Sequence, residues 1–489
     1  MSLGMTLIQK GALAVACLSA FARVGFAEDA GVAPQAASDA PKRIFSETEA
    51  EKTNRLAWWQ HDRFGLFIHF GLYAIPARGE WVKSREKIPE ADYNRDYFDR
   101  FNPDLFDAKD WARRAKAAGM KYAVLTTKHH DGFALWDTKV SDYKITNTAF
   151  KRDLVKEFAE AFRAEGLRVG FYFSVMDWHH PDYKLDYNHP LAPKGGFTDE
   201  SFAKLNEGRD MDRYRKFMFA QVEELLTEYG RVDIMWFDFT PTGKYGKTAE
   251  DWDAVNLLKM ARSHQPWLIT DNRLGLTDYV DGGDFVTPEC MKVRSWPKVN
   301  GKRVPWETCQ TMGAGWGYDC RPGARWCDTP QLLELLIDTV SHGGNLLLNI
   351  GPTARGQFPK KACERLDGFA EWMGVHSRAI YGCTQAPEGF VAPPGTILTY
   401  NEKANRLYIH LLTYPMQRLP LTFTDKVAFA QFLHDGREIK VGFIPEWQKH
   451  EHMGANPEDD TGFLILPTER PDVPMPVVEI LLKETERKE

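Results

Sequence analysis

Short apolar runs and amphipathic stretches alternate along the chain from about residue 50 to residue 375. Each run is short enough to be one buried strand, and most of them are separated by stretches with a helical spacing of apolar positions. Strands that alternate with helices predict an α/β fold, a (β/α)8-type barrel of parallel strands, over residues 45–375. The eight runs are residues 64–71, 122–127, 169–174, 233–238, 267–271, 284–289, 306–311 and 345–351.

Three amphipathic stretches carry clear helix signals. Asp153 is a suitable N-cap for a helix that ends at Gly166, and a second helix is expected over residues 213–229. A third is expected over residues 330–340, with Thr329 as its N-cap. The runs from residue 267 to residue 311 carry the weakest strand signal, because their spacing leaves little room for helices between them.

The pattern changes at about residue 376, where single apolar and polar positions begin to alternate between short turns. This two-residue period is typical of strands with one buried face. It predicts a C-terminal antiparallel β-sandwich domain over residues 376–489. We expect this domain to cover the flank of the barrel.

The N-terminal segment has the composition of a secretory signal peptide, which we place at residues 1–27. Small residues precede the expected cleavage after Ala27, and Arg23 leaves the apolar part too short to span a membrane. The protein is therefore expected to be secreted or periplasmic, and lipid attachment at Cys17 is not favoured because the apolar run before it is short. Residues 28–44 form a flexible linker by composition.

Charge and aromatic content narrow the class of ligand. The 62 Lys and Arg nearly balance the 68 Asp and Glu, which gives a formal net charge of −6 and excludes nucleic acid as a charge-driven partner. The chain has no further stretch that is apolar and long enough to cross a membrane. The 15 Trp, 17 Tyr and 30 Phe either fill cores or line a pocket for a ligand such as a sugar.

Six cysteines follow the signal segment, and none of them has the C-x-x-C spacing of a zinc or redox site. An oxidising compartment would allow disulfides among them. Cys320 and Cys327 flank a short Pro/Gly loop and are the expected pair. No cofactor is expected.

Polar and aromatic residues collect where the expected barrel strands end. The active residues of such barrels lie at the carboxyl ends of the strands, so these side chains are expected to share one pocket. Carboxylates, histidines, an arginine and tryptophans without a phosphate loop point to sugar chemistry. The residues are His69, Glu80, Trp81, His129, His130, Tyr172, Trp236, Asp238, Arg273, Glu289 and Trp316.

A glycosidase needs two carboxyl groups beside the scissile bond. Asp238 follows an apolar strand beside a tryptophan and is our candidate nucleophile; a structural hydrogen bond is its alternative role. Glu289 ends another run and is our candidate acid/base. Glu307 is the rival for that role, or else a buried structural carboxylate.

The histidines allow a second interpretation, in which His129, His130 and Asp131 bind a metal ion and the protein is a metal-dependent hydrolase. Neighbouring residues of a regular strand face opposite sides, which argues against chelation by this triplet, and we expect no metal. In the sugar interpretation the imidazoles bond to sugar hydroxyls. Arg273 could instead lie at the surface, and the tryptophans could simply fill the core.

At these residues the sequence resembles glycoside hydrolase family 29, the α-L-fucosidases. The matching segments lie in family order within residues 58–356, and KHHDGFALWD and GGNLLLNIGP are long enough to exclude chance. The other matching segments are FGLFIHFGLYAIPARGEW, GFYFSVMDWHHPDY and DIMWFDF.

The resemblance implies an exo-acting α-L-fucosidase that works with retention of configuration through a covalent fucosyl-enzyme intermediate. Asp238 matches the family's nucleophile, and Trp316 looks like the aromatic residue that meets the fucose methyl group. The acid/base is pinned by no motif; Glu289 fits many bacterial members, with Glu307 as the alternative. The positions that hold fucose in the family match His69, Glu80, Trp81, His129, His130, Tyr172, Trp236 and Arg273.

A different class of function also fits the barrel, namely a sugar-binding protein without catalysis. Such a protein would keep the histidines and tryptophans but lose a carboxylate, and the presence of Asp238 argues against it. The expected partner is a fucosylated glycan or glycoconjugate. A homo-oligomer is compatible with the sequence.

Overall fold

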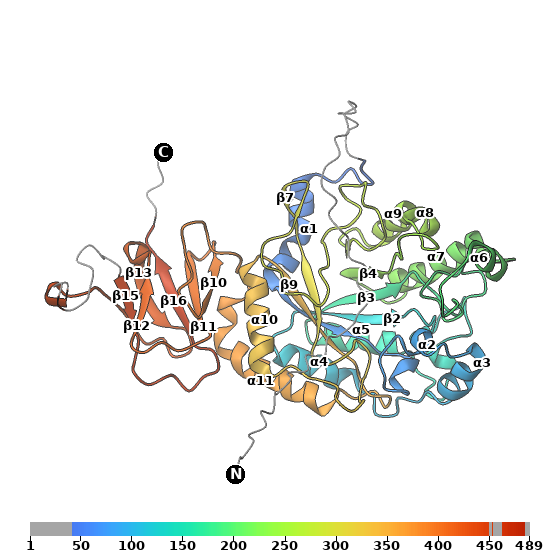
Figure 1. Cartoon of the computed structure of the whole chain (residues 1–489), viewed down its shortest axis with the longest axis horizontal. Coiled ribbons are helices and arrows are strands. Elements are labelled where there is room, and N and C mark those ends of the chain that lie inside the picture. The colour runs from blue at the N-terminus through green and yellow to red at the C-terminus, as the bar shows by residue number, and fades with distance from the viewer. Residues whose placement is uncertain (1–41, 449–451, 453–461, 485–489) are drawn as a thin grey trace, which may run out of the picture. The chain divides into compact units, whose positions relative to one another are not determined.

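Seven parallel strands form the sheet of the barrel, in the order β5-β4-β3-β2-β1-β9-β8 (Figure 1). The structure is a computed structural model of the chain that describes residues 42–448, 452 and 462–484. The predicted α/β class and parallel barrel are confirmed. The strands are β1 (Phe64–Ile68), β2 (Tyr122–Lys128), β3 (Arg168–Ser174), β4 (Ile234–Asp238), β5 (Ile269–Thr270), β8 (Glu307–Thr311) and β9 (Asn345–Ile350).

The predicted strand at residues 284–289 is wrong as a regular strand, although this segment fills the gap between β5 and β8. It makes only isolated parallel bridges to its neighbours, so its register is not continuous. Pro288 lies in it and has no backbone N–H to donate to a ladder. The bridges are Asp271 with Phe285, Val286 with Trp306, and Glu289 with Cys309.

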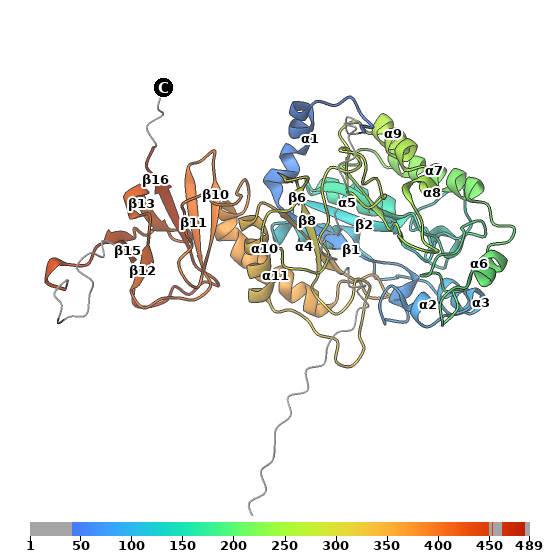
Figure 2. The ribbon, with the colours of Figure 1, turned by 45° about the horizontal axis from the view of Figure 1, so that its top comes forward.

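Helices pack around the outside of the strands (Figure 2). Asp153 caps the N-terminus of α5 as predicted, and the helix expected over residues 213–229 begins and ends two residues earlier. The N-cap of α10 is Asp328 and not Thr329, because the Asp328 carboxylate accepts the N–H of Gln331 in a capping box. The outer helices are α4 (Ala108–Ala117), α5 (Leu154–Ala164), α7 (Met211–Thr227), α9 (Ala254–His264), α10 (Thr329–Ser341) and α11 (Lys360–His376).

Shorter elements lie in the loops and before the first strand. The helices among them are α1 (Glu49–Asp62), α2 (Val82–Arg85), α3 (Glu90–Tyr93), a π-helical turn (Asn94–Phe98), α6 (Asp199–Leu205) and α8 (Ala249–Trp252). Single 3-10 turns are Leu72–Ala74, Ile145–Asn147, Ser377–Ala379, Thr424–Lys426 and Glu446–Gln448, and a small hairpin joins β6 (Lys298–Val299) and β7 (Lys302–Arg303).

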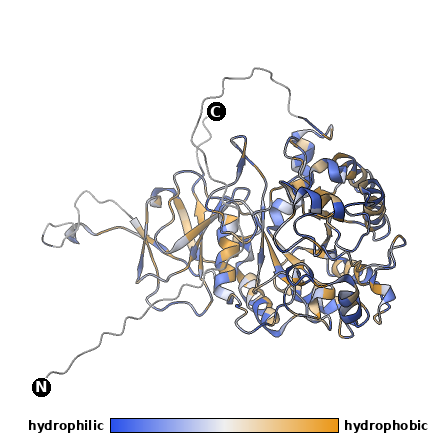
Figure 3. Cartoon of the chain, turned by 45° about the vertical axis from the view of Figure 1, so that its right-hand side comes forward, coloured by the Kyte–Doolittle hydropathy of each residue, from blue (hydrophilic) through white to orange (hydrophobic). Residues whose placement is uncertain are grey.

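Alternate residues of the barrel strands pack on opposite sides, and both sides are apolar. Figure 3 colours the chain by hydropathy, with the hydrophobic residues in orange. Phe67, Tyr172 and Trp236 belong to an inner cluster, whereas their neighbours Phe171 and Phe237 pack in the outer cluster with the helices. The inner cluster fills the barrel beneath the carboxyl ends of its strands. Since side chains fill the barrel interior, a functional cavity is expected only at the carboxyl ends of the strands.

The C-terminal strands form two antiparallel sheets that pack on a shared apolar core, as predicted. Helix α11 precedes the first of them, and Trp372 of this helix donates its indole N–H to the carbonyl of Met475. One sheet contains β10 (Thr396–Asn401), β11 (Arg406–Leu411), β16 (Val477–Leu482) and β13 (Val427–Phe432), and the other β12 (Arg418–Leu421), β15 (Gly462–Ile465) and β14 (Lys440–Gly442).

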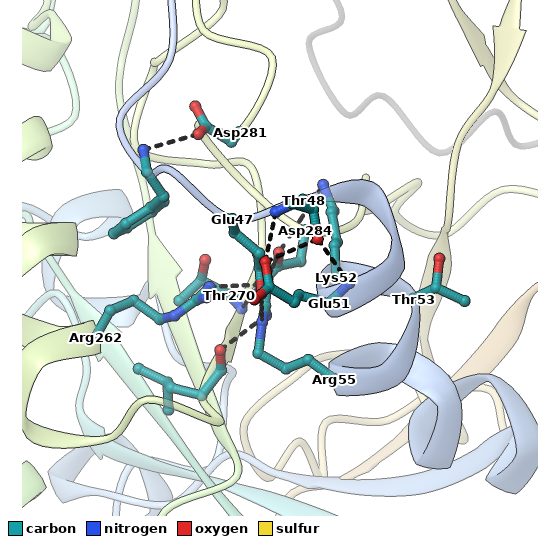
Figure 4. A network of polar contacts seen from close by, with 12 residues as sticks. Glu47, Thr48, Glu51, Lys52, Thr53, Arg55, Arg262, Thr270, Asp281 and Asp284 are labelled. Atoms are coloured by element: carbon teal, nitrogen blue, oxygen red, sulfur yellow. Dashed lines mark hydrogen bonds and ion pairs between the residues drawn. The ribbon is translucent and has the colours of Figure 1, made fainter.

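A buried ionic network ties α1 to the irregular side of the barrel (Figure 4). The Arg55 guanidinium contacts Glu47 at 2.6 Å and Asp284 at 2.8 Å, and only 7% of the Arg55 and Asp284 side chains is exposed. Asp284 also accepts the backbone N–H of Thr270 at 3.0 Å, and Arg262 contacts Glu47 at 3.1 Å. The network therefore fixes the start of segment 284–289 to β5.

We expect Arg55→Met to lower the free energy of unfolding by about 3 kcal/mol, because it removes both hydrogen bonds of the guanidinium to the buried Asp284 carboxylate. Urea unfolding followed by tryptophan fluorescence measures this change. Arg43→Ala is the matched control, since its pair with Glu49 is exposed and should contribute at most about 0.5 kcal/mol. Equal losses in the two variants would contradict the assignment.

The predicted signal peptide, Cys17 and most of the linker lie outside the described residues. Within those residues, no helix is both long and apolar enough to cross a membrane. The expected Cys320–Cys327 disulfide is wrong: all six cysteines of the described part are free. The two residues are held apart by different anchors, since the N–H of Cys320 donates to Ala77 and that of Cys327 to Met312.

Candidate active site

A cavity with about 380 Å³ of empty space, part of it open to solvent, lies at the carboxyl ends of the barrel strands. It brings together ten of the eleven residues that the sequence predicts for the site. The exception is Glu80, which does not line the cavity. The lining residues are Phe67, His69, Trp81, His129, His130, Tyr172, Trp236, Asp238, Phe239, Arg273, Glu289, Cys309 and Trp316.

Asp238 ends β4 and points its carboxylate into the cavity, with 7% of the residue exposed. Its Oδ2 accepts the hydroxyl of Tyr172 at 2.8 Å, and its Oδ1 accepts Nη1 of Arg273 at 3.1 Å. The Nε2 atom of His130 lies 3.8 Å from Oδ2. These contacts fix the direction of the carboxylate without covering it.

Arg273 joins the two candidate catalytic carboxylates. Its Nη1 contacts Asp238, and its Nη2 contacts Glu289 Oε2 at 2.8 Å. The guanidinium also lies over the Trp236 ring, 4.5 Å from the ring centroid, and its Nε donates to the Thr287 hydroxyl at 2.8 Å. Because the guanidinium is a rigid fork, both carboxylates are held at the same group.

Burial dominates the ionisation of Asp238 and raises its pKa to about 6. The nearby carboxylate of Glu289 raises this pKa further, whereas the charge of Arg273 and the hydroxyl of Tyr172 lower it. Glu289 differs in its surroundings, because 41% of its side chain is exposed. The site thus pairs one buried carboxyl group with one that solvent reaches.

His129 and His130 both line the cavity although they are adjacent in sequence. The pairing of β2 with β3 shifts register between Thr126 and Lys128, and both histidines follow the end of β2. A bulge of this kind redirects side chains next to active sites. Neighbouring residues therefore need not face opposite sides here, which the strand period alone would have required.

The cavity histidines are electrically neutral. Burial lowers the pKa of His69 to about 3, and it lowers the pKa values of His129 and His130 well below the ordinary value. Arg273 adds to this effect at His69 and His130 through its positive charge. Neutral imidazoles offer lone pairs to hydroxyl groups, which suits a polyhydroxylated ligand.

Glu307 lies deeper in the barrel than the cavity and does not line it. The residue is fully buried, and its Oε2 accepts the indole N–H of Trp59 at 3.2 Å and the hydroxyl of Tyr122. Burial raises its pKa to about 7. This geometry is that of a structural carboxyl group inside the barrel.

Glu80 supports the wall of the cavity from behind. It is buried, and its Oε2 accepts the backbone N–H of Gly317 at 2.9 Å, next to Trp316. A Cβ atom at Gly317 would lie 2.7 Å from the Tyr73 ring, so a glycine is needed for this close approach. The Trp316 ring then packs 5.1 Å from His69.

The sequence analysis missed Phe67, Phe239 and Cys309. Phe67 lies two residues before His69 and Cys309 two residues after Glu307, so the two-residue strand period was a usable signal for both. Phe239 follows Asp238 and packs 6.4 Å from Trp81. No periodicity predicts the position of Phe239, because β4 ends at Asp238.

The metal interpretation does not fit the positions of the side chains. Asp131 accepts the hydroxyl of Tyr93 at 2.9 Å and does not line the cavity with His129 and His130. Across the described ranges, no three or more His, Cys, Asp or Glu side chains are grouped so that they could hold a metal ion. The residues of this site therefore do not form a ligand set.

Two carboxyl groups at one end of a barrel, in a cavity walled by aromatic rings and lined by histidines, fit the active site of a glycoside hydrolase. The sequence model of the alpha-L-fucosidase family matches residues 32–378. The chain belongs to this family.

Known relatives agree with the family. Human plasma alpha-L-fucosidase is 31% identical over 388 residues, which cover 73% of this chain and 76% of that protein. The structure of alpha-L-fucosidase isoenzyme 1 from Paenibacillus thiaminolyticus is 42% identical, with a TM-score of 0.79 over 88% of this chain and all of that one.

A second similar structure contains a reaction intermediate. It is a trapped covalent intermediate of an alpha-L-fucosidase of glycoside hydrolase family 29 from Bacteroides thetaiotaomicron, in complex with 2-fluoro-fucosyl fluoride. It is 27% identical, with a TM-score of 0.74, and covers 92% of this chain and 98% of that one.

Proposed function

We propose that this protein removes terminal α-L-fucosyl residues from glycans or glycoconjugates with retention of configuration. The observation that carries the proposal is the pair of carboxylates, Asp238 and Glu289, held by the one guanidinium of Arg273 in a cavity of monosaccharide scale. The attachment of both to one group suits the ~5–5.5 Å separation of retaining enzymes better than the ~6.5–9.5 Å separation of inverting ones.

In the proposed first step, Asp238 attacks the anomeric carbon while Glu289 protonates the departing oxygen. Tyr172 and Arg273 direct the Asp238 carboxylate towards the sugar. In the second step, Glu289 removes a proton from water, which releases α-L-fucose. The solvent exposure of Glu289 supports both its role as proton donor and its access to that water.

The rest of the lining suits a small sugar with one apolar side. His69, His129 and His130 would bind its hydroxyl groups, and Trp316 would contact its methyl group. Trp81 and Trp236 would form the remaining walls. Glu80 would act on the sugar indirectly, through the loop that carries Trp316.

We also propose that the protein is exported. The apolar, small-residue segment at residues 1–27 supports this proposal, because it has the length and ending of a signal peptide. N-terminal sequencing of the protein recovered from the medium or periplasm tests it, and a chain that begins at Met1 would contradict it.

The expected result with 4-nitrophenyl α-L-fucoside is release of both products, with α-L-fucose as the first anomer formed. Proton NMR during the first minutes distinguishes the α from the β anomer before mutarotation mixes them. The matching α-L-rhamnoside and β-D-galactoside are controls and should not react. Formation of β-L-fucose first would exclude a retaining mechanism, and no activity on α-L-fucosides would exclude the proposal.

A further inference from the structure

The hydrogen bond between His69 and Asn349 can be given a direction. Its Nδ1 lies 2.7 Å from Oδ1 of Asn349, whose Nδ2 donates to the carbonyl of Trp316 at 2.7 Å. A carbonyl can only accept, so the Asn349 side chain must turn its NH₂ group to Trp316 and its oxygen to His69. An amide oxygen also only accepts. His69 Nδ1 therefore carries the proton, and Nε2 carries a lone pair.

His130 is held in the same way by a different residue. The Ser174 hydroxyl donates to the carbonyl of Met176 at 2.8 Å, so its single hydrogen is already used. Its oxygen, 2.6 Å from His130 Nδ1, must then accept from that nitrogen. His130 Nε2 is left with a lone pair and faces Oδ2 of Asp238 at 3.8 Å.

Charged groups face both rings. At His130 the Asp238 carboxylate lies 3.8 Å from Nε2 and favours a second proton, whereas burial and the positive charges of Arg273 and Lys128 lower the pKa of the ring. Asn349 and Ser174 are buried behind the cavity and do not line it. The titratable rings that pack against His69 are those of His129 and Tyr172, with ring centroids 5.7 and 5.5 Å away, and the positive charge of Arg273 also acts on it. None of these groups favours a protonated His69.

We propose that Asn349 and Ser174 are positioning residues that fix His69 and His130 in the Nδ1–H tautomer, so that both rings present Nε2 to the ligand as a hydrogen-bond acceptor. If the proposed function holds, the sugar hydroxyls that meet these two rings must act as hydrogen-bond donors. A sugar that is substituted or fluorinated at those hydroxyls has no hydrogen to donate there and should bind more weakly.

The tautomers can be observed in the free enzyme without any substrate. Long-range proton–nitrogen NMR spectra of the ¹⁵N-histidine-labelled protein, assigned with His69→Gln and His130→Gln, distinguish a protonated Nδ1 from a protonated Nε2. We expect both rings to be protonated at Nδ1 between pH 5 and pH 8. Protonation of Nε2 in either ring would overturn the proposal for that ring.

Asn349→Asp tests the same inference through binding. The new carboxylate raises the pKa of His69, and a protonated ring donates from Nε2 and no longer accepts there. We expect KM for 4-nitrophenyl α-L-fucoside, relative to wild type at the same pH, to be about 10-fold higher at pH 5 than at pH 8, with a smaller change in kcat. A uniform rise in KM at all pH values would show a merely structural role and overturn the proposal.

Asn345→Asp is the matched control. Asn345 lies on the same strand, β9, but its side chain contacts Trp59 and Arg63 and does not reach His69. An aspartate there gains an ion pair with Arg63, and the pH dependence of KM should equal that of wild type. The NMR result does not depend on activity, so an inactive protein with both rings in the expected tautomer would refute the proposed function but not the tautomers.

Discussion

Asp238→Ala should lower kcat on α-L-fucosides by about 10⁴-fold or more, because the covalent intermediate can no longer form. Sodium azide should restore part of the activity by entering the space that the carboxylate leaves. Azide would attack from the face opposite the leaving group, so the product should be β-L-fucosyl azide. The kinetic measurement is release of 4-nitrophenol, and NMR identifies the azide product.

The ionisation of Asp238 should also determine how kcat/KM of the wild-type enzyme falls at low pH. The pKa of Asp238 is raised to about 6, and attack requires the ionised form. Lowering the pH through about 6 protonates the nucleophile, so kcat/KM of the wild-type enzyme should fall as the pH drops below this value. For the Asp238→Ala variant described above, a kcat within 10-fold of wild type would show that Asp238 is not the nucleophile.

Glu289→Ala should affect substrates according to their leaving groups. An oligosaccharide needs its departing oxygen protonated, so kcat/KM on a fucosyl-oligosaccharide should fall about 10²–10⁴-fold. 4-Nitrophenolate leaves with little help, so kcat/KM on its fucoside should fall much less. Azide should react with the fucosyl-enzyme intermediate of this variant and give α-L-fucosyl azide, the opposite anomer to that from Asp238→Ala.

Glu307→Gln is the matched control for this experiment. The amide oxygen can still accept from Trp59 and Tyr122, and the change lies below the cavity. We expect kcat/KM on both substrates to stay within about 3-fold of wild type, which is less than 1 kcal/mol. If Glu307→Gln instead discriminated between the leaving groups and Glu289→Ala did not, the acid/base would be Glu307.

The two glutamates show what a sequence pattern can and cannot predict. The strand period indicates which side of the sheet a residue faces, and Glu307 does face the barrel interior. It does not indicate depth. Glu307 at the start of β8 lies among buried side chains, and Cys309, two residues further along, is the first β8 residue to line the cavity. Only the stacking of neighbouring strands sets that depth.

Seven of the eight predicted runs are strands of the barrel. For these runs, the length of the apolar stretch was enough to identify a buried strand. Segment 284–289 differs because its hydrogen bonds depend on its neighbours and not on its own pattern. The tautomers of His69 and His130 were beyond prediction for a similar reason. Asn349 is 280 residues away from His69 in the chain, and only the fold brings them together.

The two candidate catalytic carboxylates lie on different kinds of element. Asp238 ends the regular strand β4, whereas Glu289 ends the irregular segment 284–289 between β5 and β8. In the proposed mechanism, His69, His130 and Asp238 lie on or directly after continuous strands, whereas Glu289 stands at the end of a segment anchored by Asp284 at one end and by Arg273 at the other. We expect changes in this segment to alter where the proposed proton donor stands, and to leave the rest of the pocket in place as long as Thr287 keeps its bond to Arg273. Substitutions in this segment are therefore expected to change which leaving groups the enzyme accepts. The preference for fucose as the sugar should stay the same.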